Sequence, residues 1–457
     1  MSGLFGTLSI ALSSLSVSQQ EMATTSNNVA NANTTGYSRE VPDVAAGDPI
    51  AEGSLSVGTG VVLQKIESLR DSILEIQLNQ ATQQQSQLNS SLAQLQQLQT
   101  QFASSTSGIG ADISNFFNSL QQLSPDPSNL NLRQSVLTAA STLATDFNNT
   151  ASNLQTQRSN LDLNVEQGVG QVNTLTAQIA SVDAQISNLQ NAHLDASSLV
   201  DTQTTLIRQL SGLIDVSVIP TNQGITLATA NGTTLVSGSR SYALSTQLGS
   251  GNVQHIMAGS QDITASLTGG SLAGMVQIRD QEIPGIGTSL DELATGLATN
   301  LNAANAKGFD LENPSQPGGD IFSGTGAAAT LKVTMTDPAL IAASSDGTTG
   351  SNGNLINFAN VAETALGNGK TPINSYASIV FQVGNDTSNT SSAADASSLI
   401  LQQLQNQRGS ISGVSLDEEA ANLIQYQTAY QAAARVVSTV NSLLSDAVNL
   451  GLGAAVQ

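Results

Sequence analysis

Residues 4–32 read LFGTLSIALSSLSVSQQEMATTSNNVANA, and residues 416–448 read LDEEAANLIQYQTAYQAAARVVSTVNSLLSDAV. In both segments, apolar or small side chains recur in alternating steps of four and three residues. They are Leu4, Leu8, Ala11, Leu15, Ser18, Met22, Thr25, Val29 and Ala32, then Leu416, Ala420, Leu423, Gln427, Tyr430, Ala434, Val437, Asn441, Leu444 and Val448. A spacing of about 3.5 residues keeps one seam facing a partner helix. The two ends of the chain therefore predict helices that pair with each other or with neighbouring copies.

The composition limits the classes of partner and the shape of the core. The chain has 457 residues, with 13 Lys plus Arg against 34 Asp plus Glu and a net charge of -21. This charge argues against nucleic acid or an anionic membrane as a partner. Aromatic residues make up 3% and Trp is absent, which suits long, thin helical packing better than a thick globular core.

Cysteine usage and the N-terminal segment bear on export. There is no Cys, which excludes disulfides and thiolate metal sites. The first 20 residues lack the basic region of a secretory signal, and no stretch reaches the ~18 apolar residues of a membrane span. If the protein leaves the cell, we expect it to use another route.

The interior of the chain alternates between helical and strand periodicity. Helices are expected at about 65–102, where the polar middle 80–87 is expected to be solvated, and at 112–123. The longest seam runs from Val136 to Leu189, roughly 80 Å of helix at 1.5 Å per residue. A period of two marks strands between 215 and 268, with a hairpin at Asn231-Gly232. Further helices are expected at 283–301, 373–408 and 416–450, and one strand at 331–335.

These elements predict a mainly α fold with a β insertion. Long antiparallel helices form a rod, the terminal coiled-coil helices pair on assembly, and a small antiparallel β domain lies outside. The expected domains are a tube-forming domain (1–35 plus 415–457), a helical rod (36–214 plus 269–309 plus 339–414) and a β-rich outer domain (215–268, with 310–338 as an alternative addition). This path brings the two termini together.

Candidate chemical sites favour a structural role over catalysis. His193 and His255 are the only histidines, and neither has a second His or a carboxylate pair at metal spacing. The acidic residues Asp310, Glu312 and Asp320 do not meet the calcium-loop pattern, so we interpret them as a solvated turn. No nucleophile elbow or nucleotide-binding loop is present. We expect neither an enzyme nor a bound cofactor or metal.

The terminal helices are expected to order on assembly rather than in the free chain. Thr24 to Asn28 are poor helix formers, and seams of Ala, Ser, Thr, Gln and Asn bury little apolar area. Ser415 and Glu418 form a capping box, and Asp417 to Glu419 complement the helix dipole, so the C-terminal helix has a defined start.

Two motifs at opposite ends carry a family resemblance. Residues 26–39, SNNVANANTTGYSR, resemble the N-terminal signature of bacterial flagellar rod, hook and hook-associated proteins, and residues 429–440, AYQAAARVVSTV, resemble the matching C-terminal helix. Residues 412–419, 269–275, 279–280 and 308–311 resemble the hook-associated protein 1 family within that superfamily. The similarity extends nearly end to end, while 215–268 matches only in pattern.

The resemblance implies an extracellular structural subunit of the flagellum. Proteins of this family form an adaptor ring that joins hook to filament, with terminal helices lining the export channel. It implies a hook protein on one side, hook-associated protein 3 on the filament side, export without a signal peptide by the flagellar type III apparatus, and an export chaperone on the C-terminal helix. We expect Leu8, Leu15, Met22 and Val29 to pack with Leu423, Tyr430, Val437 and Leu444 in the assembly.

Two alternatives stay open at this point. A flagellar hook or distal rod protein shares the terminal motifs but lacks the long helical middle at 130–190. A secreted coiled-coil surface adhesin, from a different class, would need a signal peptide.

Overall fold

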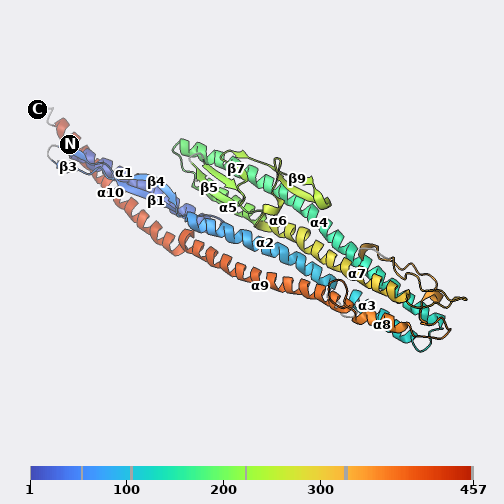
Figure 1. The fold of residues 1–457 in the computed structure, drawn as a ribbon. Helices are drawn as coiled ribbons and strands as arrows, with labels where there is room; N and C mark the ends of the chain where they lie inside the picture. The colour runs from blue at the N-terminus through green and yellow to red at the C-terminus, as the bar shows by residue number, and fades with distance from the viewer. Residues whose placement is uncertain (1, 53–54, 103–106, 222–223, 324–327, 454–457) are drawn as a thin grey trace.

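The computed structural model describes residues 2–52, 55–102, 107–221, 224–323 and 328–453. The molecule is elongated (Figure 1): α2, α4, α7 and α9 run along a rod, and α1 and α10 extend together from one end. The helices are α1 (Ser2–Asn31), α2 (Ser72–Phe102), α3 (Ile109–Leu123), α4 (Leu130–Asn191), α5 (Ser197–Leu213), α6 (Gly270–Gln277), α7 (Ile283–Asn305), α8 (Leu355–Glu363), α9 (Pro372–Ser412) and α10 (Leu416–Gly453). The expected mainly α fold with a β insertion is confirmed.

The long helix α4 organises the rod. It has 62 residues and extends beyond the predicted seam at both ends. It begins where the Asn129 side chain accepts hydrogen bonds from the amides of Asn131 (3.0 Å) and Leu132 (3.4 Å), and it ends before His193, whose φ is +56°. His193 therefore takes part in stopping the helix, which is a structural role.

Two apolar cores lie along α4. Its first half packs with α3 and α7 and shares one core with residues of α8 and α9, and Phe147 on that half is fully buried. Its second half packs with α5, α6 and the β-sheets, where Val165 and Ile179 are fully buried. One helix thus joins both cores, which explains why the rod is long and continuous.

The β insertion lies against the second half of α4 (Figure 1). One sheet has the order β5-β6-β7-β8 and the other β11-β10-β9, all antiparallel. The strands are β5 (Ser217–Thr221), β6 (Gly224–Ala228), β7 (Thr234–Ser237), β8 (Arg240–Ser241), β9 (Leu244–Leu248), β10 (Gln254–Ala258) and β11 (Gln261–Asp262). The turn at Asn231-Gly232 joins β6 to β7 as predicted, with Gly232 at φ +86°. The strand expected at 263–267 is instead a short 3₁₀ turn, Thr264–Ser266.

The helix expected from residue 65 begins later, at Ser72. Residues before it form β4 (Val61–Ser68), which pairs antiparallel with β1 (Glu40–Ala46), and β2 (Ile50–Glu52) pairs with β3 (Leu55–Val57). The Asp71 carboxylate caps α2 by accepting from the amide of Ile73 at 2.9 Å. The β1–β4 ribbon packs on α1. Residues 40–46 and 61–68 therefore lie with the terminal helices, whereas we had expected them in the rod.

The polar middle of α2 is covered rather than solvated. Gln83 Nε2 donates to the carbonyl of Val216 at 2.7 Å, and Ser90 Oγ donates to the carbonyl of Ser271 at 3.0 Å. A Cβ on Gly274 would lie 2.5 Å from the carbonyl oxygen of Gln87, so α6 approaches α2 closely only because Gly274 has no side chain. Small polar residues therefore permit close helix packing here.

The strand expected at 331–335 does not form, and residues 310–323 and 328–338 do not join the β-sheets. A single bridge links Phe322 to Val333, and Phe322 and Leu331 are buried in the first core. Asn302 Oδ1 accepts from the amides of Ile321 and Phe322 at 3.0 Å, so a buried amide side chain takes the place of a strand ladder.

In the acidic loop, Glu312 and Asp320 are exposed as expected, but Asp310 is not solvated. The Asp310 side chain is buried, and its Oδ1 accepts from the amides of Glu312 (3.1 Å) and Gln316 (2.7 Å). It stabilises the loop by satisfying backbone donors.

Candidate functional site: the terminal helix pair and its polar junction

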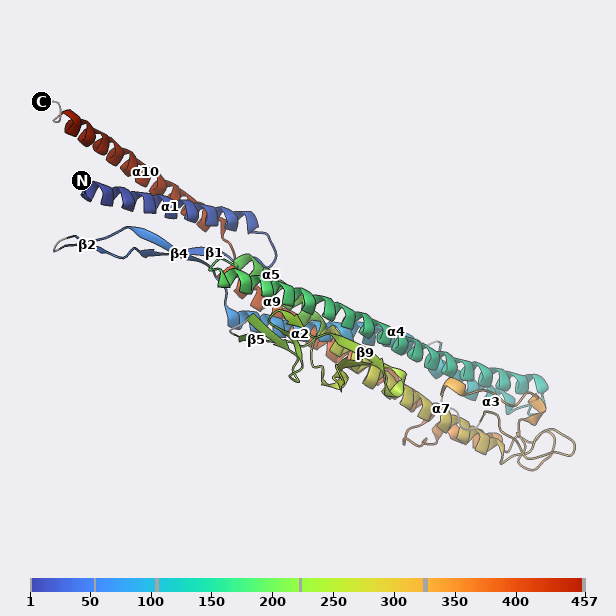
Figure 2. The same ribbon diagram turned by 90° about the horizontal axis from the view of Figure 1, so that it is seen from above.

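The two chain termini meet in one antiparallel helix pair. Figure 2 shows α1 and α10 side by side, with the N- and C-terminal ends at the same tip of the molecule. The β1–β4 ribbon packs against α1 as well. We had expected the terminal helices to become ordered only on assembly. The pair instead forms within a single chain, because contacts at its base, the end next to the rod, hold both helices.

The eight expected interface residues all lie on this pair. Leu8, Leu15 and Met22 of α1 are half-buried, whereas Val29 is 43% exposed. The centre of the α1 seam is formed by the small side chains Ala11, Ser18 and Thr25, which are buried. Little apolar area is therefore covered within the pair itself.

The α10 seam consists of two columns of residues, each with a spacing of seven. One column is the expected one and the other is not. Leu423, Tyr430, Val437 and Leu444 are half-buried. Each residue of the second column lies one position before the residue that we expected. The members of this column are Glu419, Tyr426, Ala433, Val440 and Ala447. Of the column that we expected, Val448 is 53% exposed. Both columns satisfy the four-three spacing, and the contacts of Glu419 determine which of them faces α1.

At the base of the pair, Asn28 joins three segments through its side-chain amide. Asn28 Nδ2 donates to the carbonyl of Glu40 (2.8 Å) and to Glu419 Oε2 (3.2 Å). Its Oδ1 accepts from the amide of Glu40 (2.9 Å) and from the Tyr37 hydroxyl (2.8 Å). Asn28 is 1% exposed, and its amide is fully hydrogen-bonded. We call Asn28, Tyr37, Arg39, Glu40 and Glu419 the polar junction.

Arg39 connects the polar junction to the start of α10. Its Nε lies 2.6 Å from Glu419 Oε1, and its Nη2 lies 2.9 Å from Glu418 Oε1. Its backbone amide donates to the carbonyl of Ser412, and its carbonyl accepts from the amide of Leu69. One residue thus connects α10 with the end of α9 and the end of β4. The Glu418 carboxylate pairs with Arg39, so the expected capping box keeps only the Ser415 half, at 3.5 Å.

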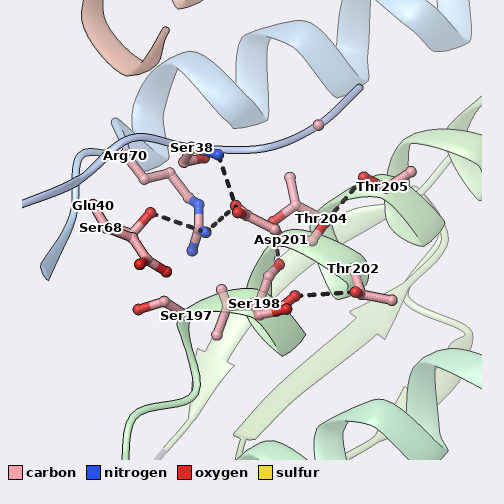
Figure 3. A network of polar contacts seen from close by, with 12 residues as sticks. Ser38, Glu40, Ser68, Arg70, Ser197, Ser198, Asp201, Thr202, Thr204 and Thr205 are labelled. Carbon is pink, nitrogen blue, oxygen red and sulfur yellow. Dashed lines mark hydrogen bonds and ion pairs between the residues drawn. The ribbon is translucent and has the colours of Figure 1, made fainter. Parts of the chain in front are cut away.

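A second set of ion pairs links the polar junction to the rod. Figure 3 shows Arg70, which follows β4, beside Asp201 of α5; Arg70 Nη2 lies 2.5 Å from Asp201 Oδ1. The amide of Ser38 donates to Asp201 Oδ2 at 3.0 Å. Because Asp201 accepts from both, α5 is attached to both ends of the ribbon.

Glu75 of α2 completes this attachment. It pairs with Arg208 of α5 at 2.5 Å and with Arg408 of α9 at 2.6 Å. Arg408 Nη2 also donates to the carbonyl of Gly36 at 3.0 Å. Two rod helices, α5 and α9, therefore bind the segment that follows α1, and Glu75 of α2 holds the arginines of both, which restrains the angle of the terminal pair relative to the rod.

Burial and neighbouring charges shift the pKa values of three residues in the polar junction. Burial, followed by the charges of Glu40, Asp201 and Glu419, raises the pKa of Tyr37, so its hydroxyl stays a neutral donor. Burial lowers the pKa of Arg39, but hydrogen bonds to Glu418 and Glu419 outweigh it and the pKa is raised overall. Burial raises the pKa of Glu40, against a hydrogen bond from Asn27.

The polar junction holds its segments together through hydrogen bonds and ion pairs, so its chemistry is that of binding and positioning.

The second histidine has a structural contact in the β-sheets. His255 lies 2.6 Å from Asp262, which links β10 to β11, and the hydrogen bond to Asp262 raises the pKa of His255. Within the described ranges, no group of three or more His, Asp or Glu residues could hold a metal ion. In the same ranges, no helix has the length and apolarity to cross a membrane.

Sequence reasoning did not identify the polar junction as a unit. Residues 26–39 carried the family resemblance, but the contact of Asn28 with Glu419 joins positions 391 apart. The available signal was a cluster of Asn residues with Tyr37 and Arg39 directly after an apolar seam, because buried amides and guanidinium groups need several partners.

Comparisons with known proteins agree along the whole chain. Residues 95–322 match the flagellar hook-associated protein FlgK helical domain, residues 8–37 the flagella basal body rod protein model, and residues 406–450 the C-terminal model of flagellar basal body rod proteins FlgEFG. Flagellar hook-associated protein 1 of Escherichia coli (strain K12) is 26% identical, with 96% of this chain and 98% of that protein covered. The protein of the same name from Bacillus subtilis (strain 168) is 29% identical, with 99% and 100% covered.

A solved structure shares the fold. The flagellar hook junction protein FlgK from Burkholderia pseudomallei has a TM-score of 0.67 and 18% identity, and the match covers 74% of this chain and 100% of that one. Relatives of one name span nearly the full chain, and the match to the FlgK helical domain includes the long helix α4. The chain therefore belongs to the flagellar hook-associated protein 1 family.

Proposed function

We propose that this protein is a structural subunit of the bacterial flagellum, an adaptor that joins hook to filament outside the cell. In this proposal, copies assemble into a ring through α1 and α10, which together with the β1–β4 ribbon form the tube-forming domain. The helical rod surrounds that tube, and the β-sheets form the outer domain. The observation that carries the proposal is the unpartnered apolar surface of the terminal helix pair.

The pair exposes large apolar side chains on its outer faces. Phe5 and Leu12 of α1 are 57% and 50% exposed, and Ile424 and Leu443 of α10 are 65% and 49% exposed. Burying one such side chain is worth about 1.5–3 kcal/mol. A surface of this kind on a helix pair favours packing against further helices.

The distribution of charge also supports assembly through α1 and α10. Between Ser2 and Asn31 the only charged residue is Glu21, and after its first turn α10 has only Arg435 and Asp446. Solvent-facing helices usually carry charges of both signs, which keep them apart from other proteins. The rest of the chain has most of its net charge of -21, so the assembling surface is close to neutral on an otherwise acidic protein.

The partners follow from this placement and from the family. We infer a hook protein on one side of the ring and hook-associated protein 3 on the filament side. The exposed apolar face of α10 would suit an export chaperone before assembly, and export would use the flagellar type III apparatus without a cleaved signal peptide. No nucleic acid or membrane partner is proposed.

Deleting the gene tests the proposal. Electron microscopy of the deletion strain should show hooks without filaments, and flagellin should appear in the culture medium. Missing hooks would instead assign the protein to the hook or distal rod. Intact flagella would contradict any flagellar role, and a surface adhesin would then be the remaining alternative.

A further inference from the structure

Glu21 and Arg435 are isolated charges on the terminal helix pair. Glu21 is the single charged residue of α1, and Arg435 is the single basic residue of α10. Neither side chain has an ion pair or hydrogen bond within the described part of the chain. The arginines that do have polar partners are Arg39, Arg70, Arg133, Arg158, Arg208, Arg279 and Arg408.

The antiparallel register keeps Glu21 and Arg435 apart within one chain. Asn28 contacts Glu419, so seven residues back along α1 Glu21 lies level with Tyr426. In agreement, burial and then the charge of Glu21 raise the pKa of Tyr426. Arg435 is nine residues further along α10, which is about 13 Å at 1.5 Å per residue. An ion pair inside one chain would need the helices to slide by more than two turns.

The surroundings of the two charged side chains are those expected of an ion pair at an interface between copies. Glu21 is half-buried, no cation among the described residues pairs with it, and burial raises the pKa of its carboxyl. Arg435 is exposed among small and apolar residues, with Ala432 and Val436 as neighbours. If assembly covers both charges without pairing them, each would lose hydration at a cost of several kcal/mol. A guanidinium is well suited to meet a carboxylate under such conditions.

We propose that Arg435 of one copy binds Glu21 of a neighbouring copy, and that this ion pair sets the axial offset between adjacent terminal helix pairs. The inference rests on the proposed assembly through α1 and α10. The offset equals the separation along the helices, about 13 Å, because the partner must bring its Glu21 level with Arg435. Asp446 is the remaining acidic candidate on the pair beyond the first turn of α10, but it is exposed and needs no cation to offset burial.

Charge reversal tests the pair. In cells that carry Glu21→Arg or Arg435→Glu, the fraction of hooks bearing filaments should fall about tenfold or more, because like charges then meet across the contact. The double variant should restore filaments to within about twofold of wild type. Arg435→Glu combined with Asp446→Arg should not restore them. Unaffected single variants, no rescue by the first double variant, or rescue by the second would each overturn the inference.

The absence of Cys allows a direct test of proximity. Glu21→Cys and Arg435→Cys in one chain should give a ladder of cross-linked multimers when purified hook and filament structures are treated with a short bismaleimide, whose length replaces that of the Arg and Glu side chains. The two positions of one chain are about 13 Å apart along the helices, and a link within one chain would not add to the ladder. Each single-Cys variant should stay monomeric. Monomers from the double-Cys variant, when it is present at the junction, would contradict the inference.

These outcomes are distinct from failure of the proposed function. If immunogold labelling finds the wild-type protein away from the hook–filament junction, the proposed function fails. If the wild-type protein is there and the variants behave differently from the expectations above, the ion pair alone fails. Circular dichroism of each variant, compared with wild type, checks that the rod has folded.

Discussion

The rod and the terminal helix pair are both helical, yet they bury different kinds of surface. In the rod, Phe116, Leu143 and Phe147 are fully buried. In the pair, the buried residues of the seam are small or of moderate size: Ala11, Ser18 and Thr25 on α1, and Ala433 and Val440 on α10. The rod therefore has a core sufficient for its own folding, whereas the pair depends on its polar junction and on neighbours for further burial.

The largest expected effect comes from a charge in the seam of the pair. Leu15→Asp or Val437→Asp should abolish incorporation at the junction, because a buried unpaired carboxylate costs several kcal/mol in every subunit. Neither position belongs to the two cores of the rod, so the thermal unfolding of the rod should be unchanged. Immunogold electron microscopy measures incorporation and circular dichroism measures unfolding. Normal incorporation of both variants would contradict the role assigned to the pair.

The matching change in the rod should show the opposite pattern. Phe147→Ala leaves a cavity beside α3 and α7 and should lower the free energy of unfolding by about 3–5 kcal/mol. Urea titration followed by circular dichroism gives this value. If the loss were below about 1 kcal/mol, the rod would not be the independently stable part of the molecule.

A smaller effect is expected at the polar junction. Asn28→Ala leaves the Tyr37 hydroxyl and the backbone of Glu40 without their partner, at about 1–3 kcal/mol. We expect faster hydrogen exchange in α1 and the start of α10, with the rod unaffected. Asn27→Ala is the control, because Asn27 is exposed and its bonds to Tyr37 (3.4 Å) and Glu40 (3.2 Å) are longer. Equal exchange in both variants would argue against a specific role for Asn28.

The smallest expected effect depends on pH and lies in the rod. Burial, followed by the neighbouring Asp146, raises the pKa of Asp112 to about 7. At a pH well below 3.8, the ordinary pKa of Asp, the Asp112 carboxyl is protonated in both the folded and the unfolded chain. Asp112 therefore does not change the free energy of unfolding at that pH. Between that value and about 7, the unfolded chain ionises first, so the free energy of unfolding falls as pH rises and then levels off.

Replacing this carboxyl should remove the pH dependence. Asp112→Asn should be more stable than wild type by roughly 1 kcal/mol at pH 8 and equal to it near pH 3. Urea titrations at the two pH values measure the difference. A variant that is less stable than wild type at pH 8 would show that Asp112 acts as a hydrogen-bond acceptor rather than as a strained acid.

Regular periodicity predicted the elements that have a single dominant apolar face. The seam from Val136 to Leu189 predicted α4, and Asn231-Gly232 predicted the β6–β7 turn. Prediction failed where another element decides the local structure. Residues 65–68 suit a helix or a strand, and pairing with β1 selects the strand; 331–335 suit a strand, but the amides of Asn302 and Asn148 bind the nearby backbone instead.

By itself, the sequence determined that the chain is mainly helical, that its ends carry matching seams, and that its terminal helices have few charges, because these depend on local spacing and composition. Only the tertiary structure decided which column of α10 faces α1 and how the pair is fixed to the rod. Both depend on the contacts of Asn28 and Arg39 with Glu419, residues that are almost 400 positions away in the chain. Such contacts form through folding and have no periodicity from which they could be read.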